Sequence, residues 1–292
     1  MAARPQDDAP DAASGRLPPG LYIVAGPIGN LGDLTLRAAD VLRRADLVAC
    51  EDTRVTAKLL RAAGSRAPMQ AYHDHSPTAL TDSLAARALL EAVALVSDSG
   101  TPLVSDPGYA LVRAARAAGA RVTPVPGPNA ALAALSAAGL PTDRFFFAGF
   151  LPARAAARAD AILALKAVPG TLIFHETGPR LAGTLAALAD GLGDREAVIA
   201  REITKRHEEF RSGSLAQLAG AVAREGPPKG EMVILVGPAA AGRGEAPGAV
   251  EAALAEALSR MPAGRAAASV AAAFGLSRAE VYAMALKAQA RP

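Results

Sequence analysis

The polar stretch from Val96 to Gly108 concentrates the side chains that could do chemistry. This stretch follows the apolar run AVALV and contains two aspartates, two prolines, two glycines and four serines or threonines. That run has the length and β-branched content of a buried strand, so the polar residues fall at its carboxyl end, where open α/β sheets bind ligands. Asp, Gly and Pro also build ordinary turns, which is the alternative interpretation. So long a polar segment favours a ligand-binding loop.

A second loop, Gly26–Asp33, follows the first strand-like run and carries glycines at 26, 29 and 32. A dinucleotide fingerprint needs glycines at i, i+2 and i+5, and Pro27 lacks the N–H that would face a pyrophosphate. The absence of Gly-Lys-Ser or Gly-Lys-Thr excludes a P-loop. We predict instead a loop lined by backbone groups, close to the Asp98 loop if their strands are near neighbours.

The run Pro124–Ala130 is a third candidate loop. Prolines on both sides of Gly127 stiffen the backbone, and the small Ala130 and Ala131 leave space for a flat group such as adenine or ribose. A rigid turn into a helix, with Pro128 in the first turn, would explain part of this pattern without a ligand.

Charged residues follow two strand-like runs in the second half, in Phe174–Arg180 and Ala200–Phe210. His175 and His207 lack metal-ligand spacing, so we expect no metal. The run REITKRHEE is either a solvated hairpin or a set of cations and carboxylates that grips phosphate and activates a hydroxyl.

The surrounding sequence alternates strand-like and helix-like runs, which predicts parallel sheets covered by helices. We expect an α/β fold of two α/β domains, because one core rarely grows to this length. A helix-turn-helix or a small packing appendage would close the chain. The predicted segments are a disordered tail 1–20, an N-terminal domain 21–139, a C-terminal domain 140–239, a linker 240–250 and a helical extension 251–292.

Composition sets further bounds. The chain has 292 residues, is 51% hydrophobic and carries a formal charge of +3, which permits a nucleic-acid partner without requiring one. The single cysteine, Cys50, lies in an apolar run and is expected in the core. No apolar stretch is long enough to span a membrane and no signal core is present, so we expect a cytoplasmic protein with no membrane partner.

Taken in order, the motifs LYIVAGPIGNLGDLTLRA, ACEDTR, VSDSGTPLVSDPG, PVPGPNA, FAGFLP, FHETGPR, AREITK and KGEMVILVG resemble the tetrapyrrole methylase superfamily. The likeness is closest to its ribosomal RNA branch, the small subunit methyltransferase I family, and covers about residues 20 to 240. It implies a donor-binding cleft between two α/β domains and a homodimer. It also implies transfer of a methyl group from S-adenosyl-L-methionine to the 2′-hydroxyl of a cytidine in small-subunit (16S) ribosomal RNA, within the assembled 30S subunit.

The resemblance also implies which residues hold the donor, largely through backbone groups. These are Pro27, Ile28, Thr101, Pro102, Leu103, Val104, Ala130, Ala131, Leu132, His175 and Met232. The loop interpretation adds Asp98, Gly100, Pro126 and Gly127.

No catalytic base can be transferred from the resemblance, so that role stays open among Glu202, Lys205 and Asp52. Arginine suits phosphate and ribose, and the candidate substrate contacts are Arg54, Arg180, Arg201 and Arg206. A methylase of a corrin or porphyrin precursor is the alternative, and a non-catalytic nucleotide-binding module is a third interpretation. The motifs ACEDTR, FHETGPR and REITK favour the RNA branch.

Overall fold

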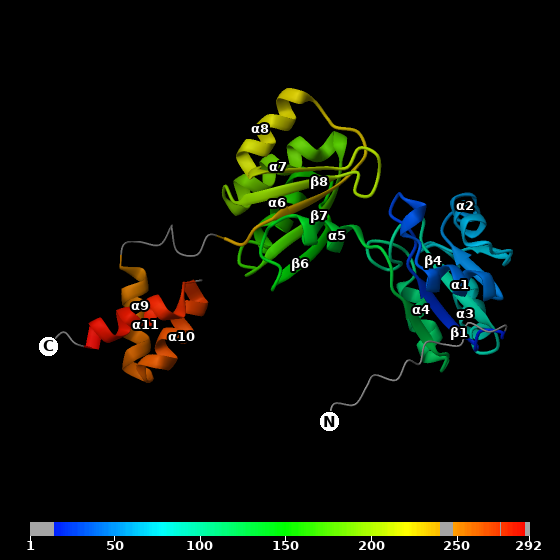
Figure 1. The fold of residues 1–292 in the computed structure, drawn as a ribbon, viewed down its shortest axis with the longest axis horizontal. Helices are drawn as coiled ribbons and strands as arrows, with labels where there is room; N and C mark the ends of the chain where they lie inside the picture. Colours follow the sequence, from blue (N-terminus) through cyan, green and yellow to red (C-terminus); the bar gives the residue numbers. More distant parts are fainter. Residues whose placement is uncertain (1–14, 240–247, 275, 290–292) are drawn as a thin grey trace. The chain divides into compact units, whose positions relative to one another are not determined.

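The computed structural model describes residues 15–239, 248–274 and 276–289. Strands and helices alternate through most of the chain and form two five-stranded sheets, followed by three helices (Figure 1). The predicted α/β class with two α/β domains and C-terminal helices is confirmed. Within the described residues, no helix is both long and apolar enough to cross a membrane.

The first sheet is parallel, with strand order β3-β2-β4-β1-β5. Its strands are β1 (Gly20–Val24), β2 (Leu47–Cys50), β3 (Met69–Ala71), β4 (Ala92–Val96) and β5 (Val122–Val125). Its helices are α1 (Leu36–Arg44), α2 (Thr53–Ala63), α3 (Thr78–Arg87), α4 (Tyr109–Ala117) and α5 (Ala130–Ala137), with a 3-10 turn at Leu31–Asp33.

Side chains alternate between the two faces of this sheet, and each face has its own core. On one face Val48 and Cys50 pack with Leu42 of α1 and Leu60 of α2. On the other, strand residues pack with α3 and α4, for example through Leu111. Both faces are therefore buried, and all the strand-ending loops lie at one edge, the carboxyl edge. Cys50 is fully buried, as expected of a core cysteine.

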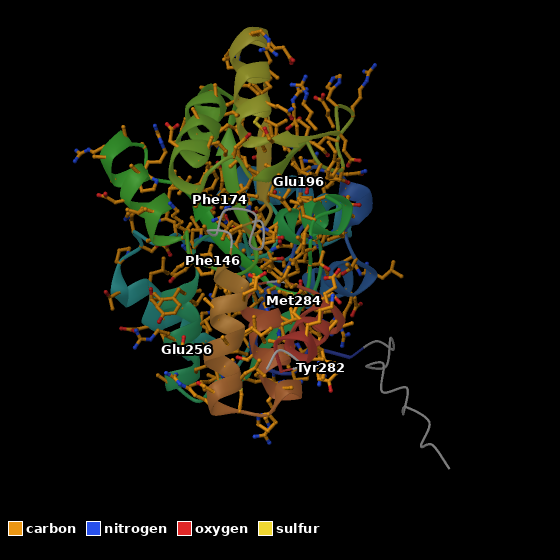
Figure 2. The ribbon with its side chains drawn as sticks, turned by 90° about the vertical axis from the view of Figure 1, so that its left-hand side faces the viewer. Phe146, Phe174, Glu196, Glu256, Tyr282 and Met284 are labelled. Atoms are coloured by element: carbon orange, nitrogen blue, oxygen red, sulfur yellow. The ribbon has the colours of Figure 1, made fainter. Side chains whose placement is uncertain are left out.

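The second sheet has strand order β6-β7-β10-β8-β9. Its strands are β6 (Phe145–Phe150), β7 (Thr171–Thr177), β8 (Glu196–Arg201), β9 (Glu209–Ser214) and β10 (Glu231–Val236). Its helices are α6 (Ala155–Ala164), α7 (Gly178–Leu192) and α8 (Leu215–Glu225). Strand β7 pairs in parallel with β6, and Phe174 on it is fully buried (Figure 2).

The last three helices, α9 (Ala249–Arg260), α10 (Ala263–Phe274) and α11 (Arg278–Gln289), bury a small core of their own around Leu254, Val270 and Val281. On α11, Met284 packs against this core, whereas Tyr282 is 42% exposed (Figure 2).

The predicted tail 1–20 is too long. Residues 1–14 lie outside the described residues, but Leu17 packs against the first core and Gly20 opens β1. The Tyr22 hydroxyl donates to the Pro18 carbonyl at 2.8 Å, which holds this segment on the domain. Of the predicted linker, residues 240–247 also lie outside the described part, and α9 already begins at Ala249.

The chain forms two compact units, and the main boundary between them lies between Ala137 and Ala138. Two later segments also belong to the first unit. Segments Ala200–Glu209 and Glu231–Val233, which include terminal residues of β8, β9 and β10, group with the first unit. The charged run after β8 therefore belongs with the loops of the first sheet.

Candidate functional site

Three loops at the carboxyl edge of the first sheet are joined by hydrogen bonds. Strand β1 pairs with β4, so the loops that follow them are neighbours. The Gly26 N–H donates to the Gly100 carbonyl at 2.8 Å, and the Gly100 N–H donates to the Pro27 carbonyl at 3.2 Å. The Thr101 hydroxyl donates to the Pro128 carbonyl at 3.0 Å, which adds the loop after β5. The loops predicted separately thus form one continuous surface.

This surface is built mainly of backbone. A Cβ at Gly127 would lie 2.9 Å from Ala25 Cβ, so only glycine permits the approach of the third loop to the first. Leu103 and Ser105 have φ of 72° and 65°, in the left-handed region that such residues rarely adopt. Strained backbone of this kind concentrates at ligand sites, where the surrounding structure holds it in place.

The loop after β5 leads directly into α5. The Asn129 side chain accepts from the Leu132 N–H at 3.1 Å and so satisfies a free donor at the start of the helix. Ala131 is buried, whereas Leu132 is 51% exposed. Of the predicted alanine pair, only Ala130 is partly accessible, and it lies at the first helical position.

Asp98 and Asp52 join the carboxyl ends of β4 and β2. The Asp52 N–H donates to the Asp98 carboxylate at 3.1 Å, and Asp52 in turn caps α2 by accepting from the Arg54 N–H at 2.7 Å. Hydrogen bonds from the Arg54 side chain lower the pKa of Asp52 to about 2. A carboxylate this acidic is a poor proton acceptor, which makes Asp52 a weak candidate base.

Asp106 is the most perturbed carboxyl in these loops, and we did not single it out from the sequence. Burial, outweighing a hydrogen bond from Ser97 and reinforced by Glu51 and Asp98, raises its pKa to about 6. Glu51 repels the Asp106 carboxylate because β2 and β4 are neighbouring strands, which places Glu51 beside the loop after β4. The signal in the sequence was the second aspartate of SDSGTPLVSDPG, but burial could not be judged there.

We predict that Asp106→Asn stabilises the fold increasingly as pH rises. The folded protein binds this proton more tightly than the unfolded chain, so the aspartate costs stability progressively from about pH 4 through pH 6. Above that range the cost is constant. Thermal unfolding of both proteins at pH 4, 5.5 and 7.5 measures the difference, with the exposed Asp160→Asn as control. An equal difference at every pH would contradict the assignment.

The run after β8 packs against the first loop, within the same contact unit. The Thr204 hydroxyl donates to the Asp33 carboxylate. The aliphatic stem of Lys205 crosses Gly29 so closely that a Cβ there would collide with it. The run connects the neighbouring strands β8 and β9, as the hairpin interpretation predicts, but Thr204 and Lys205 are held against the first loop rather than solvated.

Lys205 lies between two carboxylates. Its ammonium group is 2.9 Å from Glu202 Oε1 and 3.0 Å from Glu231 Oε2. Burial lowers the pKa of Lys205, but the hydrogen bonds to both carboxylates outweigh it and raise the value above its ordinary range. The same bond from Lys205 lowers the pKa of Glu202. Near neutral pH Lys205 is therefore a fixed cation and Glu202 a carboxylate, so of these two candidate bases only Glu202 can accept a proton.

Four arginines were predicted to contact the substrate, and they differ in how free they are. Arg54 has a side chain 89% exposed although it pairs with Asp52, and Arg206 is exposed. Arg201 lies 3.5 Å from Glu209. Arg180 donates to the Leu151 carbonyl at 2.5 Å and lies 3.3 Å from the buried Glu176, so its guanidinium is engaged in the second sheet's own packing.

His175 and Met232 lie on strands β7 and β10 of the second sheet, and Met232 belongs to a segment that groups with the first unit. His175 lies on β7 against the rings of Phe147 and Phe150, with centroids 5.1 and 5.4 Å away. Met232 on β10 is 2% exposed, so it could offer a ligand only its backbone. Within the described residues, no cluster of three or more His, Cys, Asp or Glu could hold a metal ion.

Comparison with known proteins gives the following likenesses. Residues 20–219 match the family model of the tetrapyrrole (corrin/porphyrin) methylases, and residues 244–289 match the RsmI C-terminal HTH domain. The chain is 50% identical over 268 residues to the ribosomal RNA small subunit methyltransferase I of Mesorhizobium japonicum, covering 91% of both chains. It is 46% identical to the protein of the same name from Escherichia coli O157:H7, covering 92% of this chain and 95% of that one.

Among solved structures, the uroporphyrin-III-C-methyltransferase from Thermus thermophilus matches with a TM-score of 0.52 and 25% identity, over 75% of this chain and 94% of that one. A diphthine synthase matches with a TM-score of 0.57 and 17% identity, over 74% and 90%. The latter likeness shows a common fold and no more.

Proposed function

The chain belongs to the tetrapyrrole methylase family and, within it, to the ribosomal RNA small subunit methyltransferase I proteins, and we propose that it methylates the 2′-hydroxyl of a cytidine in small-subunit ribosomal RNA. S-adenosyl-L-methionine is the methyl donor. The observation that carries the proposal is the junction of three loops through Gly26, Gly100, Thr101 and Pro128.

The joined loops suit this donor. Adenosine and a carboxylate-bearing chain need backbone donors and acceptors together with little side-chain bulk, and the loops supply both at Pro27–Ile28, Gly100–Val104 and Gly127–Ala130. When bound, the donor supplies a methyl group on a sulfonium sulfur, a carbon already activated for displacement. The rigid loops then have one main task, which is to hold that carbon in line with an incoming oxygen.

Lys205, Glu202 and Glu231 are the polar groups best placed to act on the ribose. A ribose hydroxyl is a weak nucleophile at neutral pH. Glu202 can accept or orient its proton, and the Lys205 ammonium stabilises negative charge that develops on the oxygen. Because Lys205 lies over Gly29, these groups stand beside the first of the three loops.

RNA contacts are proposed for Arg54, Arg201 and Arg206, which suit phosphate and ribose groups. Arg180 is a weaker candidate because it would have to leave Leu151 and Glu176. We further propose that the substrate is the assembled 30S subunit in the cytoplasm and that the enzyme acts as a homodimer.

The corrin or porphyrin alternative shares the fold and donor class. Incubating the purified protein with labelled donor and either small ribosomal subunits or uroporphyrinogen separates the two. We expect label in the RNA and none in the macrocycle, and label in the macrocycle alone would overturn the proposal. Label in neither, with donor binding intact, would favour a non-catalytic nucleotide-binding module.

We predict that deleting residues 243–292 weakens substrate binding without impairing donor binding. Helices α9–α11 have their own core, so their loss should leave both sheets folded. Arg265, Arg278 and Lys287 give them exposed cations, whereas Arg260 is partly neutralised by Glu256 at 2.9 Å. The apparent KM for small subunits should rise, and the difference from the full chain should shrink as salt screens the phosphates. Loss of donor binding in the truncation would show that the helices are part of the second domain's structure.

A further inference from the structure

A pocket of about 460 Å³ lies in the unit that contains the first sheet, between α3, α4 and the loop after β3. The residues proposed above to bind the methyl donor, to act as the base or to contact RNA phosphates do not line this pocket. Its volume is in the range of small-molecule sites. Its lining combines aromatic rings, carboxylates, hydroxyls and one cation, from Tyr72, Asp74, Ser76, Thr78, Asp82, Tyr109 and Arg113 among others.

The wall that carries Tyr109 is fixed by the fold. Gly108, directly before α4, has φ of 129°, and a Cβ there would lie 2.7 Å from a Leu95 methyl group. The Gly108 N–H donates to the Asp74 carboxylate at 3.3 Å, which links the start of α4 to the loop after β3. On the opposite side, the buried Tyr72 shares a hydrogen bond with Thr81 of α3 at 3.3 Å. The pocket is thus held open between two anchored elements.

Tyr109 is the exposed aromatic surface of this pocket. Tyr109 is 66% exposed, although it is the first residue of α4, a helix that packs on the sheet. The Arg113 guanidinium, one turn later, lies 5.7 Å from the centre of the Tyr109 ring. An exposed ring with an arginine over it offers two planar surfaces, the ring and the guanidinium, on which an unpaired base can stack, and the arginine can also meet the phosphate attached to that base.

The remaining polar groups of the pocket limit the chemical class of ligand that it can bind. Asp74 and Asp82 are acceptors and would repel a ligand that is only anionic, whereas the exocyclic amino group of a nucleobase donates to such carboxylates. Cytosine, adenine and guanine carry that group and uracil does not. Ser76 and Thr78 add hydroxyls that can serve either role.

One segment connects the pocket with the joined loops, because Gly108 directly precedes Tyr109 and donates to Asp74. Gly108 and Asp106 end the same loop whose Gly100 and Thr101 contact Pro27 and Pro128. The end of the pocket at Asp74 and Tyr109 therefore lies at the carboxyl edge of the same sheet as the donor loops, and its lining continues along α3 and α4 to Asp82 and Ala117.

We infer that the pocket between α3 and α4 binds one unpaired, amino-bearing nucleotide of the RNA substrate, stacked on Tyr109, with its amino group on Asp82 or Asp74 and its phosphate near Arg113. This inference rests on the proposed function, because it assigns a subsite for the same RNA.

The test compares full-length Tyr109→Ala with Tyr109→Phe, which keeps the ring, and Arg113→Ala with Arg116→Ala, which removes an exposed cation from the same helix outside the pocket. Tyr109→Ala should raise the KM for small subunits about five- to hundredfold, the range that loss of one stacked base gives. Tyr109→Phe and Arg116→Ala should stay near wild type, and donor affinity should not change.

Direct binding separates this inference from the proposed function. Cytidine 5′-monophosphate should perturb the NMR or fluorescence signals of the wild type more strongly than uridine 5′-monophosphate, and Asp82→Asn should reduce that preference. If wild type methylated no RNA but bound the cytidine nucleotide, the proposed function would fail and the pocket would stand. An unchanged KM in Tyr109→Ala together with no nucleotide binding would overturn the inference. So would a change of oligomeric state in Tyr109→Ala, which would identify the surface as an interface between copies of the chain.

Discussion

Replacing Thr101 by tryptophan should reduce affinity for S-adenosyl-L-methionine at least about a hundredfold while the protein stays folded. The Thr101 hydroxyl joins the second and third loops through the Pro128 carbonyl, and its side chain is only partly buried. An indole at this position would lose that bond and fill the space that the donor needs, and each tenfold loss of affinity corresponds to about 1.4 kcal/mol.

Calorimetric titration with the donor measures the effect, and the unfolding midpoint checks the fold. Thr101→Ser is the matched control because it keeps the hydroxyl, and its affinity should remain within a few-fold of wild type. Unchanged affinity in Thr101→Trp would remove the donor from this loop. Loss of folding in Thr101→Trp but normal donor binding by a smaller replacement, Thr101→Val, would show that the loop bond is structural only.

The second large effect is expected at Lys205. Lys205→Met keeps the aliphatic stem over Gly29 but removes the cation, and it leaves Glu202 and Glu231 without the charge between them. We expect kcat to fall about a hundredfold, the usual contribution of one proton-handling or charge-stabilising group. Donor affinity should change little.

Single-turnover methylation at saturating donor and RNA isolates this step. Lys58→Met, at an exposed lysine of α2, controls for the loss of a positive charge on the same unit. A normal kcat with a raised KM for RNA would show that Lys205 binds phosphate instead. Gly29→Ala should reproduce part of the Lys205→Met defect, because its Cβ would displace the lysine stem.

The positions of the candidate loops could be predicted from the sequence, because strand ends and loop composition are local properties. The Gly26, Asp98 and Gly127 loops were recognised by composition, and parallel strands place their carboxyl ends at one edge. The contact between the first two loops could not be predicted in the same way. It depends on the pairing of β1 with β4, and strand order is not a local property of the sequence.

What the sequence could not supply was burial. Arg180 reads as an exposed cation after a strand, yet α7 packs so that Glu176 is 1% exposed and holds it. Asp106 reads as a turn residue until β2 brings Glu51 beside it. Tyr72, Tyr109 and Arg113 carry no motif at all, because only the packing of α3 against α4 brings them to one pocket.

The decisive measurement identifies the atom of the ribosomal RNA that receives the methyl group. Small subunits methylated with labelled donor can be digested to nucleosides and separated by chromatography with mass detection. We predict one labelled product, 2′-O-methylcytidine, and in the intact RNA the phosphodiester bond next to the methylated ribose should resist alkaline hydrolysis. Label on a base, or on a ribose other than that of cytidine, would contradict the proposed 2′-hydroxyl methylation of cytidine.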